Sequence, residues 1–323
     1  MNSPEAFDFV VAEEHHDQRI DKYLSSVLED TSRTVVQKQI QNEAVRINDM
    51  IPARGSKTQV KIGDEVSYRP PPPEILDIVG QDIPIDIMFQ DDDIVVVNKP
   101  INLVVHPAVG HRDGTLVNAL IHHIKDFEVA TEETRPGIVH RLDKDTSGVM
   151  VVAKHIQAQK KLIELFQQRE VTKRYIAAIR GVPQEFEGSF ETMFGRHPRD
   201  RKRFSSRVHE GKTAITNYSV IEVFLACALV EVDLETGRTH QIRVHFHDHG
   251  FPLIGDPVYG SKRGSKDPRL SPILKSFERP ALHAHQLRFR HPMTNKKMEF
   301  EAPIPSDLEQ LIEALREITP NSI

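Results

Sequence analysis

The sequence predicts a mixed α+β protein, in which a large, largely antiparallel central sheet with flanking helices follows a small separate domain. Three observations predict this class. Beyond residue 80, short apolar or alternating strands recur between amphipathic helices, a pattern typical of α+β folds. Four consecutive prolines, residues 70–73, cannot enter a helix or a central strand, so they mark a domain boundary. With 323 residues, 38% of them hydrophobic, the chain is long enough for one large and one small core.

Composition and the first residues indicate a cytoplasmic protein with no membrane partner. No apolar run approaches the roughly 18–20 residues that a membrane helix requires. Residues 1–18 carry acidic side chains and neither lysine nor arginine, unlike the basic start of a signal peptide. The one cysteine, Cys227, lies in an apolar run and cannot form an internal disulfide, which suits a packing role in a reducing compartment.

Residues 16–69 are expected to fold as a small domain after an N-terminal extension, residues 1–15, and before a proline-rich linker, residues 70–80. Two helices are predicted first, and Ser32 is placed to cap the second. Two strand-like segments, AVRIN and VKIGDEVSY, follow. The apolar positions at helical spacing are Ile20, Tyr23, Leu24, Val27 and Leu28, and then Val35, Val36 and Ile40.

Residues 81–323 are expected to form one large domain. IVVVNKP, residues 94–100, and VMVVAK, residues 149–154, predict buried strands, and each precedes an amphipathic helix. ALVEVDLETG, residues 228–237, alternates apolar and acidic side chains as a strand with one solvated face does. Ser306 and Glu309 have the spacing of a capping box, which predicts a final helix. The helical stripes are Leu116, Ala119, Leu120 and Ile124; Ala158, Leu162, Leu165 and Phe166; and Leu308, Leu311, Ile312 and Leu315.

The net charge of −5 argues against a nucleic-acid partner until the charge is mapped locally. RHPRDRKRFSSRVHEGK, residues 196–212, holds seven Lys or Arg against two acids, and we call it the basic arm. Such a run is commonly a solvated face or loop. With Phe204 and two histidines among its charges, it also suits a phosphate backbone and a stacked base.

HRLDKDTSG, residues 140–148, places two carboxylates two positions apart. Asp143 and Asp145 face the same way if the segment is extended and diverge if it is a turn. Spacing alone does not choose between a catalytic pair, a metal pair, and one acting residue beside a turn residue. Asp145 precedes Thr-Ser-Gly, where an aspartate commonly accepts local backbone N–H groups, so we interpret it as the turn residue. No cap or turn explains Asp143.

Two histidines offer a candidate metal site, and two arginines offer a candidate anion clamp. His245 and His249 have the i, i+4 spacing of zinc ligands, but HFHDH lacks the glutamate of a zinc protease, so packing histidines are the better interpretation. Gly250 would end their helix. Arg238 and Arg243, in ETGRTHQIRVH, are surface charges or clamps for a carboxylate or phosphate. No glycine-rich phosphate loop occurs, so we expect neither a metal nor a nucleotide cofactor.

Six phrases of the chain resemble, in order, the successive motifs of the RluA family of pseudouridine synthases. They run from about residue 90 to residue 303 and are VVNKPINLVVHP, TLVNALIHH, RPGIVHRLDKDTSGVMVVAK, VTKRYIAAIRG, ETGRTHQIRVHFHDHGFPLIGDPVYG and ALHAHQLRFRHP. The segment before the prolines, RIDKYLSS…TSRTVVQKQIQNEAVRIND…VKIGDEV, resembles the S4 RNA-binding fold. That fold usually has glycine where this chain has Glu43 and Asp49, which puts the turn geometry there in question.

The resemblance implies an isomerase that converts uridine in RNA to pseudouridine with no cofactor and no metal. It implies that Asp143 is the catalytic group, as a nucleophile or through a glycal-forming path. Tyr175 would stack on the uracil and assist proton removal. Arg243 would form an ion pair with Asp143, and Arg141 would fill the gap left by the flipped uridine. Residues 81–323 would be the catalytic domain.

The resemblance also implies a partner, 23S ribosomal RNA of the large subunit, bound by a monomer at the helix 69 stem-loop, either free or in an assembling particle. The alternatives are another ribosomal or transfer RNA site, a non-catalytic RNA-binding assembly factor, and a histidine-dependent metal hydrolase. The implied RNA contacts are Arg19, Arg33, Lys38 and Arg46 in the S4-like domain, and Arg196, Arg199, Arg201, Lys202 and Arg203 in the basic arm.

Overall fold

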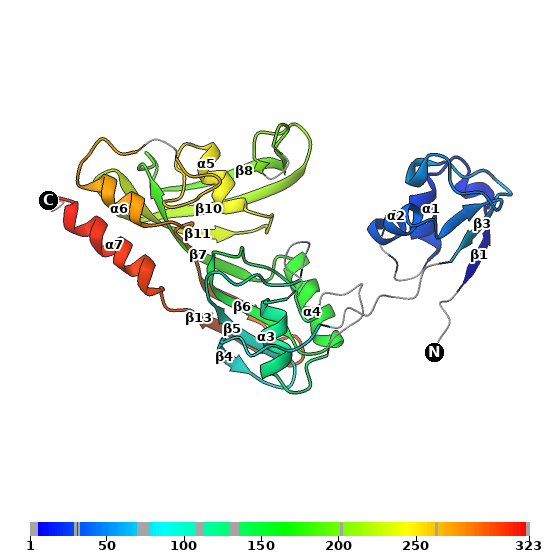
Figure 1. Ribbon diagram of the computed structural model, residues 1–323, viewed down its shortest axis with the longest axis horizontal. Helices are drawn as coiled ribbons and strands as arrows, with labels where there is room; N and C mark the ends of the chain where they lie inside the picture. The colour runs from blue at the N-terminus through cyan, green and yellow to red at the C-terminus, as the bar shows by residue number, and fades with distance from the viewer. Residues whose placement is uncertain are drawn as a thin grey trace. The chain divides into compact units, whose positions relative to one another are not determined.

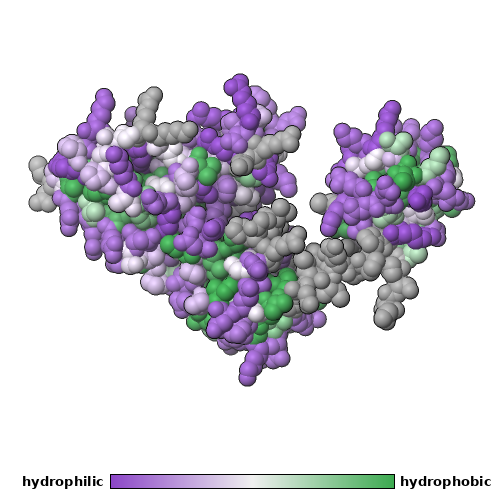
Figure 2. Space-filling view, viewed as in Figure 1, coloured by the Kyte–Doolittle hydropathy of each residue, from purple (hydrophilic) through white to green (hydrophobic). Residues whose placement is uncertain are grey.

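The computed structural model describes residues 6–28, 31, 33–69, 78–107, 113–128, 136–200, 203–261 and 264–320. Contacts divide the chain into a small unit, which holds the described residues up to Arg69, and a large unit, which holds those from residue 78 onward (Figure 1). The face of each unit drawn in Figure 2 is mostly hydrophilic. None of the described helices is both long and apolar enough to cross a membrane. Ser32 and the prolines at 70–73, the predicted cap and linker, lie outside the described residues.

The small unit packs two helices against a three-stranded antiparallel sheet with the strand order β1–β3–β2. The predicted helical stripes supply its core, in which Ile20, Leu24 and Val36 are fully buried. Its elements are β1 (Phe7–Val10), η1 (Glu13–His15), α1 (Ile20–Val27), α2 (Arg33–Gln41), β2 (Val45–Ile47), η2 (Gly55–Lys57) and β3 (Glu65–Tyr68).

Two boundaries in the small unit differ from the prediction. Phe7–Val10, predicted as part of the N-terminal extension, belongs to the small unit, because it pairs with β3 and its phenylalanines pack beside Tyr68 and Tyr23. The strand predicted over VKIGDEVSY is shorter at its start, because Gly63, at φ 82°, turns the chain within that segment.

Glu43 and Asp49, where the S4 fold usually has glycine, both adopt positive φ, 61° and 64°. This left-handed region costs a residue with a side chain roughly 1–2 kcal/mol relative to its ordinary conformations. The turns expected to need glycine are therefore formed here without it, at a cost in backbone strain.

The large unit is built on one ten-stranded, mostly antiparallel sheet, which confirms the predicted α+β class (Figure 1). The strand order is β4–β5–β6–β12–β7–β11–β10–β8–β9, and β13 pairs with β12. Among the described strands, β6 and β12 form the parallel pair. The strands are β4 (Asp86–Gln90), β5 (Ile94–Lys99), β6 (Ser147–Ala153), β7 (Thr172–Arg180), β8 (Glu187–Arg196), β9 (Phe204–Ser205), β10 (Lys212–Val223), β11 (Cys227–Leu234), β12 (Leu282–Arg290) and β13 (Lys297–Glu301).

Helices cover both faces of the central strands. Val95 and Val97 of β5 pack in one core with α3 and α5, whereas Ile94 and Val96 pack in another with α4. Burial on both faces explains why this strand is apolar throughout rather than alternating. Cys227 is buried in a third core, with α6 and α7. The helices are α3 (Leu116–His123), α4 (Ile156–Gln167), α5 (Gln241–Asp248), α6 (Leu270–Ser276) and α7 (Ser306–Ile318).

The final helix begins without the predicted capping box. Ser306 is its first helical residue, and Pro305 occupies the N-cap position with extended backbone and no side-chain cap. The Pro305 carbonyl accepts from the N–H groups of Leu308 and Glu309 at 2.9 and 3.0 Å. The helix therefore starts one residue earlier than a Ser306 cap requires.

Candidate active site

The predicted catalytic residues line one cavity of about 650 Å³ in the large unit. Arg141 and Asp143 come from the loop before β6, Tyr175 from β7 and Arg243 from α5. The sheet brings these distant segments together, because β12 lies between β6 and β7 and pairs with both. The volume lies within the range of cavities that bind small organic groups.

A tight turn over residues 143–146 leads into β6. The Thr146 N–H donates to the Asp143 carbonyl at 3.1 Å. Among the described residues, no hydrogen bond reaches the Asp145 carboxylate, so its predicted role as a local acceptor is wrong; the backbone closes this turn. Gly148, at φ 120°, seats the loop against β12, since a Cβ there would lie 2.2 Å from the Ala284 carbonyl oxygen.

Arg243 lies between two carboxylates. Its Nε and Nη2 donate to the two oxygens of Asp256 at 2.7 and 3.0 Å, and its Nη1 donates to Asp143 Oδ2 at 2.9 Å. Burial alone would lower the pKa of Arg243, but Asp256 and then Asp143 raise it above its ordinary value. Burial alone would likewise raise the pKa of Asp256, but Arg243 lowers it. The guanidinium therefore stays charged and is aimed at Asp143 by a second carboxylate.

Gln241 fixes the start of the helix that carries Arg243. Its Nε2 donates to the Ile215 carbonyl at 3.0 Å and to Thr216 Oγ1 at 2.9 Å. Its Oε1 accepts from Thr236 Oγ1 at 2.8 Å and from the Arg238 N–H at 2.9 Å. This buried amide joins β10, the loop after β11 and α5, which holds the helix at one orientation over the cavity.

Tyr175 lies in the cavity wall with 8% of its surface exposed. Burial, and then the charge of Asp143, raise the pKa of its hydroxyl well above the ordinary value. The phenol is therefore protonated at neutral pH, which suits stacking and hydrogen-bond donation. The raised pKa opposes its predicted part in proton removal, because a base must be ionised before it accepts a proton.

Lys99 stabilises the turn over residues 143–146 through hydrogen bonds to backbone carbonyls. Its side chain is buried, and Nζ donates to the carbonyls of Pro100, Leu103 and Lys144 at 2.7, 3.0 and 3.1 Å. Burial lowers its pKa to about 7, against the opposing charges of Asp145 and Asp143. Three acceptors match the three hydrogens of an ammonium, so the lysine ties the end of β5 to the loop that presents Asp143.

His240 forms the side of the cavity next to Asp143. Its Nε2 lies 3.9 Å from Asp143 Oδ1, and its Nδ1 lies 3.1 Å from the Tyr259 hydroxyl. Its backbone adopts φ 60° at the N-cap of α5. Burial lowers the pKa of His240, which favours the neutral ring at neutral pH.

Sequence reasoning missed four residues of this site: Lys99, His240, Gln241 and Asp256. All four lie inside the motif phrases that carried the resemblance. The available signal was a polar or charged side chain within an otherwise apolar segment, such as Lys99 at the end of IVVVNK.

Comparisons with known proteins decide the family. A family model described as RNA pseudouridylate synthase matches residues 93–248, which include Asp143, Tyr175 and Arg243. The chain is 43% identical over 309 residues to the RNA pseudouridine synthase YlyB of Bacillus subtilis, covering 96% of this chain and 98% of that protein. The chain belongs to the RluA family of RNA pseudouridine synthases.

A second relative of this synthase is ribosomal large subunit pseudouridine synthase D of Escherichia coli K12, 42% identical over 311 residues, with 95% of this chain and 93% of that protein covered. The solved structure of human RNA pseudouridylate synthase domain containing 1 has a TM-score of 0.55 and 28% identity, and covers 76% of this chain and 99% of that chain. The predicted reaction is thereby confirmed: the synthase converts uridine to pseudouridine in RNA.

In the small unit of the synthase, a buried carboxylate holds two of the arginines predicted to contact RNA. Asp21, fully buried, accepts from Arg19 Nε at 3.0 Å and Nη2 at 2.9 Å, and from Arg33 Nε at 3.0 Å. Arg19 and Arg33 keep 36% and 43% of their side chains exposed, so both are oriented yet reachable by solvent. Lys38 and Arg46 are exposed.

The basic arm of the synthase is partly packed against the protein. The Arg203 guanidinium lies over the Tyr259 ring, 5.1 Å from its centroid. Phe204, the candidate for base stacking, is half-buried and packs against Phe194, while Arg196 covers it at 4.5 Å from the centroid. This packing opposes a free stacking role for Phe204. Of the predicted contacts in the arm, Arg196 and Arg199 are exposed, Arg203 is half-buried, and Arg201 and Lys202 lie outside the described residues.

His245 and His249 pack within the synthase rather than facing one open site. The ring nitrogens of His245 lie 2.8 Å from Thr216 Oγ1 and 2.9 Å from Thr192 Oγ1, and burial lowers its pKa to about 4. His249 Nδ1 donates to the His245 carbonyl at 2.8 Å. Gly250 follows the helix at φ 91°, as expected of its stop signal. Both nitrogens of His245 are therefore used in hydrogen bonds to hydroxyls.

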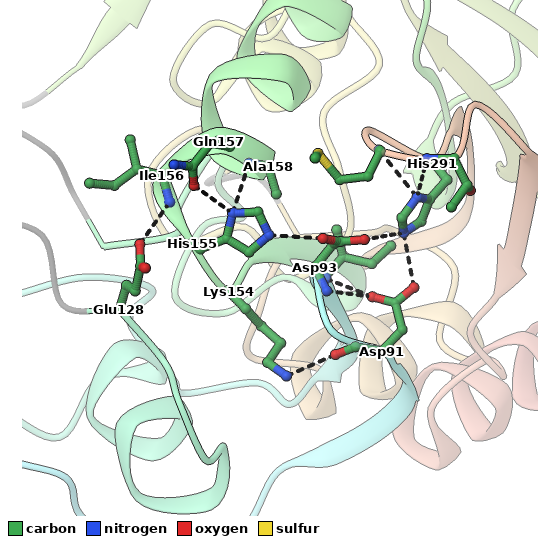
Figure 3. A network of polar contacts seen from close by, with 12 residues as sticks. Asp91, Asp93, Glu128, Lys154, His155, Ile156, Gln157, Ala158 and His291 are labelled. Atoms are coloured by element: carbon green, nitrogen blue, oxygen red, sulfur yellow. Dashed lines mark hydrogen bonds and ion pairs between the residues drawn. The ribbon is translucent and has the colours of Figure 1, made fainter.

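Another group of possible metal ligands is Asp91, Asp93 and His291, which join one network of polar contacts (Figure 3). The two aspartates lie just before the start of β5. His291 Nδ1 accepts from the N–H groups of Met293 and Thr294 at 3.3 and 3.1 Å. The ring proton of the neutral form is therefore on Nε2, which donates to Asp91 Oδ2 at 2.9 Å. A protonated nitrogen is not a metal ligand, so we interpret the cluster as a hydrogen-bonded joint between the β4–β5 turn and the turn after β12.

Proposed function

We propose that this synthase modifies uridine in 23S ribosomal RNA of the large subunit, at the helix 69 stem-loop, with Asp143 as the essential aspartate. The observation that carries the site assignment is the Asp143–Arg243–Asp256 chain, in which a buried guanidinium binds and orients a carboxylate at the cavity. The similarity to a synthase named for the large ribosomal subunit supports the substrate.

The reaction depends mainly on a carboxylate that is fixed in position beside the sugar. The N1–C1′ bond of uridine breaks, a C5–C1′ bond forms, C5 loses its proton and N1 gains one, so the reaction is a balanced isomerisation. A carboxylate beside the anomeric carbon can support departure of the base, either by attacking the sugar or by assisting a glycal path. In our proposal, Tyr175 stacks on the uracil as a neutral phenol, and the exposed Arg141 fills the gap that the flipped uridine leaves.

Mapping of pseudouridines in ribosomal and transfer RNA, from cells with and without this protein, tests the substrate. We expect pseudouridine to disappear from the helix 69 loop of 23S ribosomal RNA alone, and to return when the protein is supplied. Loss at another ribosomal stem-loop or in transfer RNA would move the substrate assignment and leave the reaction unchanged.

We further propose that the small unit is an S4-like RNA-binding module, because it combines a helix pair and small sheet with exposed Arg33, Lys38 and Arg46. Removing residues 1–73 is expected to weaken ribosomal RNA binding by roughly tenfold or more, through lost phosphate contacts. Turnover of a short stem-loop should change little, which serves as the control for folding of the large unit. Unchanged ribosomal RNA affinity in the shortened protein would contradict the module.

A further inference from the structure

One lysine in the cavity wall is set apart by its position. Lys173 precedes Tyr175 by two residues on β7, and both side chains line the cavity. Two residues along a strand span about 7 Å on the same face. Arg174, between them, faces the other way and donates to Asp233 at 3.3 Å. The strand therefore presents one cation beside Tyr175, at a separation comparable to that between the base and the phosphate of one nucleotide.

Arg169 and Arg243, which line the same cavity, have carboxylate partners, whereas Lys173 has none among the described residues. Arg169 pairs with Glu235 at 3.3 Å, and Arg243 pairs with two aspartates at the far side of the cavity. Among the described residues, no carboxylate lies within ion-pair distance of Lys173, and no hydrogen bond to its ammonium is found. Its Nζ lies over the Phe166 ring, 5.9 Å from the ring centroid.

An unpaired, partly desolvated ammonium favours an incoming anion. Burial, and to a lesser extent the charge of Arg169, lower the pKa of Lys173 to about 8. At neutral pH the side chain is still mostly protonated. In the described part of the chain, no carboxylate partner offsets the cost of its desolvation. An anion in the cavity would supply that charge and would raise the pKa again.

The surroundings of Lys173 favour a nucleotide over a simple anion. Phe166 stacks on His140 with centroids 4.7 Å apart, and His140 Nε2 accepts from the Val151 N–H at 3.1 Å. Burial lowers the pKa of His140 to about 3, so this ring is neutral. A second cavity of about 300 Å³, also lined by Lys173 and by the acidic Asp233 and Glu235, adjoins the start of β7 and leaves space for the RNA chain to continue. A cation beside stacked rings matches a phosphate followed by a sugar and base.

We propose that Lys173 binds a backbone phosphate of the RNA next to the target uridine and thereby sets which nucleotide stands over Asp143. The inference rests on the proposed function in one respect, that the target uridine occupies this cavity. Arg141, which is exposed at the same cavity, would then hold the stem while Lys173 holds the strand.

The test measures RNA affinity in the Asp143→Asn variant, which we expect to bind RNA without converting it. Stem-loop RNAs carry a neutral methylphosphonate at one linkage at a time around the target uridine. At one linkage the replacement should weaken binding about tenfold, as expected for one lost charge-assisted contact. Adding Lys173→Met should remove this sensitivity, and adding Lys173→Arg should retain it. Lys161→Met, which removes an exposed lysine of α4, is the matched control and should leave the sensitivity unchanged.

Loss of sensitivity at a single linkage in the Lys173→Met protein alone would support the proposal. The proposal would be overturned if methylphosphonate replacement weakened binding equally with and without Lys173→Met, or weakened it at no linkage. Another side chain or the overall electrostatic field of the protein would then account for binding. A different result would contradict the proposed function: substantial pseudouridine formation by the Asp143→Asn variant would refute the role of Asp143. That result comes from measuring the pseudouridine formed, not from comparing RNA affinities, so the two failures can be told apart.

Discussion

The Asp143→Asn variant is expected to lose pseudouridine formation by roughly 10³-fold or more and to keep its RNA affinity. Asp143 is 18% exposed and receives the Arg243 Nη1 donor at 2.9 Å. Asparagine keeps the size of the side chain but has no charge, so it neither attacks the sugar nor stabilises positive charge there. Single-turnover assays on a stem-loop substrate measure the rate, and filter binding measures affinity.

Asp145→Asn is the matched control for this variant. It removes the same charge two residues away, from a carboxylate with no hydrogen bond among the described residues. Its rate should stay within about threefold of the wild type, as for other substitutions away from the reacting groups. Equal losses in the two variants would indicate a general charge effect and contradict the assignment of Asp143.

The Asp256→Asn variant should be both less stable and slower. The Asp256 side chain is fully buried and binds Arg243 through both oxygens, so the substitution leaves a buried guanidinium with a neutral partner. We expect the free energy of unfolding to fall by about 3–5 kcal/mol. We also expect kcat to fall about 10–100-fold at temperatures where the variant is folded, because Arg243 is no longer held toward Asp143.

Glu222→Gln provides the control for removing a carboxylate from an arginine pair. Glu222 binds Arg316 at 2.6 Å, but the two side chains are 32% and 54% exposed. An exposed pair contributes about 1 kcal/mol or less, so stability should change little and kcat should not change. Urea unfolding and separate measurements of kcat and KM distinguish the variants. A stability loss in Asp256→Asn with unchanged kcat would show that Asp256 supports folding alone and does not position Arg243.

Local sequence patterns predicted most of the elements around the site. Unbroken apolar runs marked β5 and β6 because both strands are buried on both faces. Helical spacing marked α3, α4 and α5, and the glycine after α5 stands at its end. Predictions failed where neighbours decide the outcome. The N-terminal strand forms only because β3 is available to pair with it, and Ser306 loses its cap to the preceding proline.

Predicted RNA contacts depended even more on neighbours. The S4 resemblance marked Arg19 and Arg33 as contacts, and the basic arm marked Arg203. The structure gives each a protein partner, Asp21 for the first two and Tyr259 for the third. Lys173 lies in the motif phrase VTKRYIAAIRG, but nothing in the sequence distinguishes it from other lysines, since its importance comes from having no carboxylate partner among the described residues. A linear count of charges does not reveal which of them are already neutralised.

The sequence by itself determined the fold class, the family and its reaction, because these depend on apolar periodicity and on motifs that are continuous along the chain. Tertiary structure alone decided how the site is built. A backbone hydrogen bond across residues 143–146 makes the segment a turn, which separates Asp143 from Asp145, although their spacing suggested a pair. The order of β6, β12 and β7 in the sheet, and the buried Asp256 that aims Arg243, bring the partners of Asp143 from segments up to 100 residues away. Contacts at such separations arise from packing, and no local pattern encodes them.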